Sequence, residues 1–102
     1  MTSLSAAFAH PDPSVRLNAA LQAGLRPAAT DLDALVAQCA VEPDFQVREM
    51  LTWALIRLPA ALAVPRLVAE LDRPKPQARS QALHTLSKFR DETSWPCSFA
   101  SP

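Results

Sequence analysis

The sequence repeats itself at a step of 31 or 32 residues, and this periodicity limits the fold more than any other feature. Three prolines and three dipeptides ending in arginine keep these steps: Pro11, Pro43 and Pro74, and Val15-Arg16, Val47-Arg48 and Ala78-Arg79. A unit that recurs at this length is one supersecondary element, and neighbouring copies bury a common core. The sequence therefore predicts a chain built from three similar units.

The middle unit contains the clearest helix, predicted over residues 44–58. Its apolar positions fall on one helical face: Val47, Leu51, Ala54, Leu55 and Leu58. Trp53 and Ile56 lie on the opposite side, so little of this helix is left polar. A helix that is apolar nearly all round is covered by neighbours on both sides. We therefore expect similar helices before and after it.

Each unit reads as two helices joined by a turn with proline. The second helices are predicted at Pro13–Leu25, Asp44–Leu58 and Pro76–Phe89. The first helices carry these inner faces: Leu4, Ala7 and Phe8; Leu32, Leu35, Val36 and Cys39; Val64, Leu67, Val68 and Leu71. A single glycine among 102 residues argues against an all-β fold, which needs many turn glycines. The pattern is typical of an all-α solenoid. We expect one domain over residues 1–91, with three units at roughly 1–26, 27–58 and 59–91.

Short segments of this repeat resemble a known family. The residues that carry the resemblance are Asp12-Pro13 with Val15-Arg16, Asp44 with Val47-Arg48, and Ala63-Val64-Pro65 with Ala78-Arg79. They are similar to the HEAT-repeat family, above all to bacterial HEAT-repeat proteins, over residues 4–89. The resemblance implies a right-handed α-α superhelix of the HEAT/armadillo-like type, with about three helical hairpins.

The resemblance also bears on the arginine column formed by Arg16, Arg48 and Arg79. We expect each arginine to pair with an aspartate of its own or the adjacent unit, in preference to binding an external anion. In the third unit Lys75 stands where Asp12 and Asp44 predict an acid. A continuous ladder of Asp–Arg pairs is therefore not expected.

Charge and hydropathy narrow the class of protein. Ten basic and ten acidic residues give a net charge of zero, so the chain as a whole is no obvious binder of nucleic acids or membranes. No apolar run approaches the ~20 residues of a membrane span, and the N-terminus does not resemble a signal peptide. The two cysteines lack a CxxC spacing. We expect a cytoplasmic protein with reduced thiols.

Catalytic signals are weak. His10 and His84 are far apart, and neither stands at a metal-ligand spacing from cysteine or glutamate. A phosphate-cradling loop is excluded because Gly24 is the only glycine. Cys39 continues the inner face of its helix, which favours a buried structural thiol over a nucleophile. The sequence therefore predicts no enzymatic activity, no cofactor and no metal.

The favoured function is a non-enzymatic protein–protein interaction module, a scaffold that binds another protein or a peptide. In a solenoid the second helices line the concave face, the usual binding side. The candidate partner-binding residues are Leu17, Leu21, Glu49, Trp53, Ile56, Leu83 and His84. Leu21, Trp53 and His84 form one column, and tryptophan is the residue most enriched at interface hot spots. The alternative that Trp53 only fills space between helices stays open.

Two other functions stay open. Residues 57–90 hold seven basic residues against two acidic ones, so a nucleic-acid-binding module is the alternative. Its candidate contacts are Arg57, Arg66, Arg73, Lys75, Arg79 and Lys88. No aromatic residues alternate with them, and three repeats offer a short surface for a duplex. The second open alternative is that the chain is a structural fragment of a longer solenoid.

Residues 92–102 are predicted to form an irregular tail or an aborted fourth repeat. Trp95-Pro96 lies 31 residues after Val64-Pro65, but the segment that follows ends in Pro102. Either Trp95 and Phe99 fold back as a cap, or the exposed apolar side of the last hairpin drives self-association. We favour a homodimer through the uncapped C-terminal hairpin.

Overall fold

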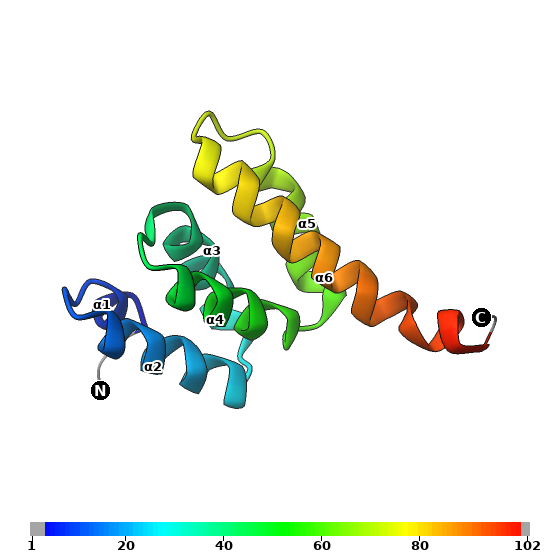
Figure 1. Ribbon diagram of the computed structural model, residues 1–102, viewed down its shortest axis with the longest axis horizontal. Helices are drawn as coiled ribbons and strands as arrows, with labels where there is room; N and C mark the ends of the chain where they lie inside the picture. The colour runs from blue at the N-terminus through cyan, green and yellow to red at the C-terminus, as the bar shows by residue number, and fades with distance from the viewer. Residues whose placement is uncertain (1–3, 101–102) are drawn as a thin grey trace.

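The computed structural model describes the backbone of residues 4–100 and the side chains of residues 4–89. The described residues form six α-helices and one 3-10 turn, without a strand (Figure 1). The elements are α1 Leu4–Phe8, α2 Pro13–Leu25, η1 Ala29–Asp31, α3 Leu32–Val41, α4 Phe45–Ile56, α5 Ala60–Glu70 and α6 Pro76–Ala100. The prediction of an all-α fold is confirmed.

The helices pack as three successive pairs. α1 contacts α2, α3 contacts α4, and α5 contacts α6. The second helices follow one another in a row, because α4 contacts α2 on one side and α6 on the other (Figure 1). α4 is therefore covered on both sides, as its apolar composition predicts.

The core follows the predicted stripe of α4. Val47, Leu51, Ala54 and Leu55 are at most 1% exposed, and Leu58 is also buried. The inner faces of α3 and α5 contribute further buried residues: Leu35, Val36, Cys39, Ala63 and Leu67. The placement of Val68 in this core is wrong, since its side chain is 48% exposed. Val64 and Leu67 of α5 and its C-cap Leu71 already occupy the inner face, and Val68 lies at the flank of the helix.

Aspartates begin two of the second helices. Asp12 Oδ1 accepts a hydrogen bond from the Ser14 amide at 2.9 Å, and Asp44 Oδ1 accepts one from the Val47 amide at 3.1 Å. Both are N-caps, which satisfy amides that have no partner within the helix. These carboxylates therefore serve the backbone of their own helices, in place of the Asp–Arg pairs that the sequence predicted.

The three arginines of the repeat bind the turn before their helix. Arg16 Nη1 donates to the carbonyl oxygens of His10 and Pro11, both at 2.9 Å. Arg48 Nη1 donates to those of Glu42 and Pro43, and Arg79 Nη1 to that of Arg73. In all three units one acceptor lies six residues before the arginine. The expected pairing of these arginines with aspartates is wrong, because the acceptor common to all three units is a backbone carbonyl of the turn.

A buried carboxylate links the first two pairs of helices. Glu42 is 0% exposed and accepts hydrogen bonds from Arg16 Nε at 2.8 Å and Arg16 Nη2 at 2.9 Å. Gln38 Nε2 and the Asp44 amide donate to the same carboxylate. Burial pushes the pKa of Glu42 upward, but these hydrogen bonds outweigh it and hold the pKa below its ordinary value. The ion pair fixes α2 against the turn between α3 and α4.

The backbone of α6 continues to Ala100, so the prediction of an irregular tail is wrong for the secondary structure of residues 92–100. Residues 77–95 contain neither glycine nor proline, and a helix that has formed extends at one hydrogen bond per residue. Nothing in this stretch stops α6 before Pro96. The side chains of Trp95 and Phe99 lie outside the described residues, and the cap expected from them stays a prediction.

Truncating the centre of the core should be costly. Leu51→Ala is expected to lower the free energy of unfolding by about 2–5 kcal/mol, because Leu51 is 0% exposed and leaves a cavity between neighbouring helices. Urea unfolding followed by circular dichroism measures this loss. The matched control is Leu62→Ala on α5, where the side chain is 47% exposed and the loss should stay below about 0.5 kcal/mol. Equal losses would contradict the placement of Leu51 in the core.

The buried ion pair predicts a pH dependence. Because the folded chain lowers the pKa of Glu42, its stabilisation is present above the unfolded pKa of about 4.3. It is lost as the pH falls through the lower folded pKa. Glu42→Gln removes this titration, so its unfolding free energy should fall less steeply between neutral and acidic pH than that of the wild type. Parallel pH profiles would show that Glu42 is not paired in the folded chain.

Candidate functional site

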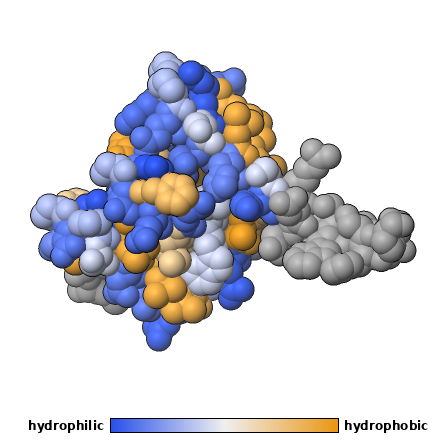
Figure 2. All heavy atoms as spheres, viewed as in Figure 1, coloured by the Kyte–Doolittle hydropathy of each residue, from blue (hydrophilic) through white to orange (hydrophobic). Residues whose placement is uncertain are grey.

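An apolar groove runs between α2 and α4. Its volume is about 480 Å³, and it is lined by Leu17, Leu21, Phe45, Gln46, Glu49, Met50 and Trp53. Gln46 and Glu49 are the only polar lining residues. Figure 2 shows apolar surface in the lower part of the view, where α2 and α4 lie in Figure 1. The groove brings together four of the residues predicted to bind a partner: Leu17, Leu21, Glu49 and Trp53.

Trp53 both packs between helices and lines the groove. A Cβ atom added to Gly24 of α2 would collide with the Trp53 indole ring, so the ring rests on the glycine backbone. The Arg57 guanidinium carbon lies 5.7 Å from the ring centroid, and Arg57 Nε donates to the Gly24 carbonyl at 3.1 Å. The indole is half-buried as a result. The Trp53 side chain therefore packs between two helices and is also accessible to a ligand in the groove.

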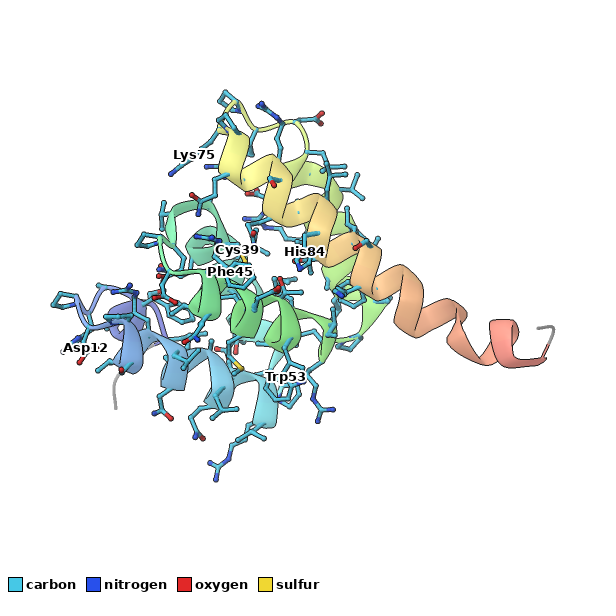
Figure 3. All side chains as sticks on the ribbon, in the orientation of Figure 1. Asp12, Cys39, Phe45, Trp53, Lys75 and His84 are labelled. Carbon is cyan, nitrogen blue, oxygen red and sulfur yellow. The ribbon has the colours of Figure 1, made fainter. Side chains whose placement is uncertain are left out.

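A smaller, more polar pocket lies between α4 and α6. Its volume is about 170 Å³, and it is lined by Phe45, Arg48, Glu49, Ser80, Gln81 and His84. Phe45 and Glu49 line both this pocket and the groove, so the two cavities adjoin along α4. Glu49 Oε2 lies 3.0 Å from His84 Nε2, which joins α4 to α6. Figure 3 shows Phe45 and His84 where α4 and α6 meet, and Trp53 toward the end of α2.

The other predicted partner-binding residues lie elsewhere. Ile56 is half-buried against the core, and Leu83 on α6 is 59% exposed but lines neither cavity. The sequence did not single out Phe45, which is 64% exposed and has the Arg48 guanidinium carbon 5.8 Å from its ring centroid. Phe45 immediately follows the N-cap of α4, and the sequence placed it inside the predicted helix without giving it a role. An aromatic residue outside the apolar stripe was the available signal.

Most of the candidate basic residues have partners in the described part of the chain. The four that make such contacts are Arg57, Arg66, Arg73 and Arg79. Arg66, for example, binds Asp33 Oδ1 at 2.9 Å and Glu70 Oε2 at 2.6 Å. Lys75 and Lys88 are exposed and have no partner among the described residues. The nucleic-acid alternative stays a prediction.

The cysteine within the described side chains is a structural thiol. Cys39 is 5% exposed, and burial, together with the charges of Glu70 and Glu42, raises the pKa of its thiol to about 12. The prediction that Cys39 is buried is confirmed, and a thiol with this pKa is inert at neutral pH. Across the described side chains, no three His, Cys, Asp or Glu residues lie close enough to hold a metal ion. None of the described helices has the length and apolarity of a membrane span.

Comparison with protein-family models, curated proteins and solved structures finds no match for this chain. The likeness to HEAT repeats therefore rests on the repeated residues themselves, from Asp12-Pro13 to Ala78-Arg79. The function has to be inferred from the groove, the pocket beside it and the residues that line them.

The contact between Gly24 and Trp53 predicts an unusual mutational effect. Alanine in place of a helical glycine normally stabilises a helix by up to about 1 kcal/mol. Gly24→Ala should instead destabilise the fold by about 1–3 kcal/mol, because the new methyl group displaces the indole ring. Thermal unfolding measures the loss, and tryptophan fluorescence in a Trp95→Phe background reports the movement of Trp53.

The matched control for this substitution is Gln22→Ala, at an exposed position of the same helix. It should change the unfolding free energy by less than about 0.5 kcal/mol and leave the fluorescence spectrum unchanged. Stabilisation by Gly24→Ala would mean that the indole does not rest on α2.

Proposed function

We propose that this chain is a right-handed HEAT-type solenoid of three helical hairpins and a non-enzymatic protein-interaction module. It binds a segment of a partner protein in the apolar groove between α2 and α4, on the concave face of the solenoid. The observation that carries this proposal is the groove itself, an open cavity of about 480 Å³ with only two polar lining residues.

The repeated backbone contacts support the solenoid. The same arginine in each unit donates to a carbonyl six residues earlier, at Arg16, Arg48 and Arg79. The second helices also follow one another in the order α2, α4 and α6. Similar units that each pack against their neighbours are the basis of solenoid folds.

The chemistry of the groove supports a protein segment as its ligand. Leu17, Leu21 and Trp53 supply apolar walls, and the exposed ring of Phe45 stands at the rim. Exposed apolar surface of this kind marks interaction sites on soluble proteins. Solenoids bind extended or helical segments along their rows of helices. A bulky apolar side chain of the partner is the group that this groove fits.

Self-association through the C-terminal hairpin is a separate proposal. Leu83 on α6 occupies the repeat position of Thr52 on α4. Thr52 is 3% exposed because α6 covers it, with the Thr85 hydroxyl 3.1 Å from its own, whereas Leu83 is 59% exposed. An exposed leucine at a stacking position supports contact with a second copy.

A peptide screen tests the proposed function. The purified chain should enrich peptides with a bulky apolar side chain from a random phage-displayed library, and Leu21→Asp should weaken their binding by about tenfold or more. Leu21 is the better test position because Trp53 also holds α2 and α4 together. Fluorescence polarisation with a labelled selected peptide gives the affinities.

The matched control is Leu62→Asp, which adds the same charge at an exposed leucine of α5 outside the groove. Its peptide affinity should equal that of the wild type. The proposal fails if no peptide is enriched, or if both aspartate variants bind as the wild type does.

A further inference from the structure

The pocket beside the groove contains an amide that lacks a hydrogen-bond partner. Among the described side chains, Gln81 Nε2 is the one buried nitrogen or oxygen atom without a partner. Buried polar groups are nearly always paired, so such an atom is costly to the free chain. Gln81 also lines the polar pocket between α4 and α6. Its terminal torsion is broad, so the carboxamide is able to turn toward a ligand in this pocket.

A second carboxamide lines the groove itself. Gln46 on α4 lines the groove and also a small polar cavity of about 100 Å³ at the start of α2 and α4. Its side chain is exposed and has no partner among the described residues. Three cavities therefore adjoin in the order polar, apolar, polar. A glutamine with an unused carboxamide lines each of the two polar cavities.

This arrangement discriminates between two kinds of peptide. A carboxamide has one donor side and one acceptor side, so it matches the N–H and C=O groups of a peptide backbone. An α-helix uses those groups internally, except in its first and last turns. An extended segment leaves them free and points them outward along its length. An extended segment can therefore offer backbone groups to both glutamines while it fills the groove, whereas the middle of a helix cannot.

The charges around the cavities restrict the ligand further. Asp44 lines the small cavity, and Glu49 lines both the groove and the pocket. Arg48 keeps its positive charge while its Nη1 donates to the carbonyls of Glu42 and Pro43, but it lines only the pocket, and neither the groove nor the small cavity. His84 lies against Glu49 at 3.0 Å. The charged lining residue is Glu49 in the groove and Asp44 in the small cavity, so a carboxylate of the ligand would be repelled there, which disfavours an acidic segment.

We infer that the partner segment, given the proposed function, is an extended, non-acidic peptide whose backbone pairs with the carboxamides of Gln46 and Gln81. One bulky apolar side chain of the segment occupies the groove between them. The unpaired amide of Gln81 gains its missing hydrogen bond when the segment binds. Binding strength then depends on the two glutamines as well as on the apolar walls.

The test uses the peptide with the highest affinity in the phage-displayed screen. Gln81→Met and Gln46→Met keep the length of the side chain and remove the carboxamide. Each substitution should weaken the affinity for the peptide by roughly fivefold to tenfold, because one hydrogen bond is lost. Gln22→Met, at an exposed glutamine of α2 outside the cavities, should bind as the wild type does. Gln81→Met should not lower the thermal stability, because it removes an unpaired buried amide.

The conformation of the bound peptide is the second readout. Isotope-labelled peptide should show chemical shifts of an extended backbone in the complex, and adding glutamates beside the apolar residue should weaken binding. The inference is overturned if the bound peptide is helical, or if both methionine variants bind normally while Leu21→Asp does not. Either of these results would be compatible with the proposed function, since the peptide still binds in the groove. If no peptide binds at all, the proposed function fails and this inference fails with it.

Discussion

The buried carboxylate of Glu42 is the interaction on which the arrangement of α2 and α4 depends. Removing a carboxylate from water costs several kcal/mol, and the charge is tolerated only with excellent hydrogen-bond geometry. Glu42 has this geometry, with two donors from Arg16, one from Gln38 and one from the Asp44 amide. Because Arg16 belongs to α2 and Asp44 caps α4, the same charge positions both walls of the groove.

The second seam, between α4 and α6, is built without such a charge pair. Arg73 stands at the repeat position of Glu42, so this seam has no buried ion pair among the described side chains. The partly exposed Glu49 and His84 side chains meet there at 3.0 Å, beside contacts between uncharged groups. Gln77 Nε2 donates to the carbonyls of Cys39 and Glu42, and the hydroxyls of Thr52 and Thr85 lie 3.1 Å apart. Neighbouring seams of one repeat therefore have different chemistry. The first carries an apolar groove and the second a smaller polar pocket, which together suit a segment with an apolar anchor and a free backbone.

Stability and proposed recognition share side chains in this molecule. The Trp53 indole rests on Gly24, lies beneath the Arg57 guanidinium and still lines the groove. The sequence predicted a column of Leu21, Trp53 and His84, but across the seams Trp53 meets Gly24 and His84 meets Glu49. Repeat spacing predicts which face of a helix a residue occupies. Repeat spacing does not predict how far one helix is shifted along the next, so the contacts between neighbouring helices could not be predicted.

The sequence alone determined the local structure: the all-α fold, the extent of α2, the stripe of α4 from Val47 to Leu58 and the buried position of Cys39. These features follow from the spacing of residues within single helices, and that spacing can be read directly from the sequence. Only the tertiary structure decided the partners of the arginines, the exposure of Val68 and the role of Phe45 beside the groove. The tertiary structure also decided that the side-chain nitrogen Nε2 of Gln81 lacks a hydrogen-bond partner. Each of these depends on how separate helices rotate and slide against one another, and that is set by packing between residues distant in the sequence.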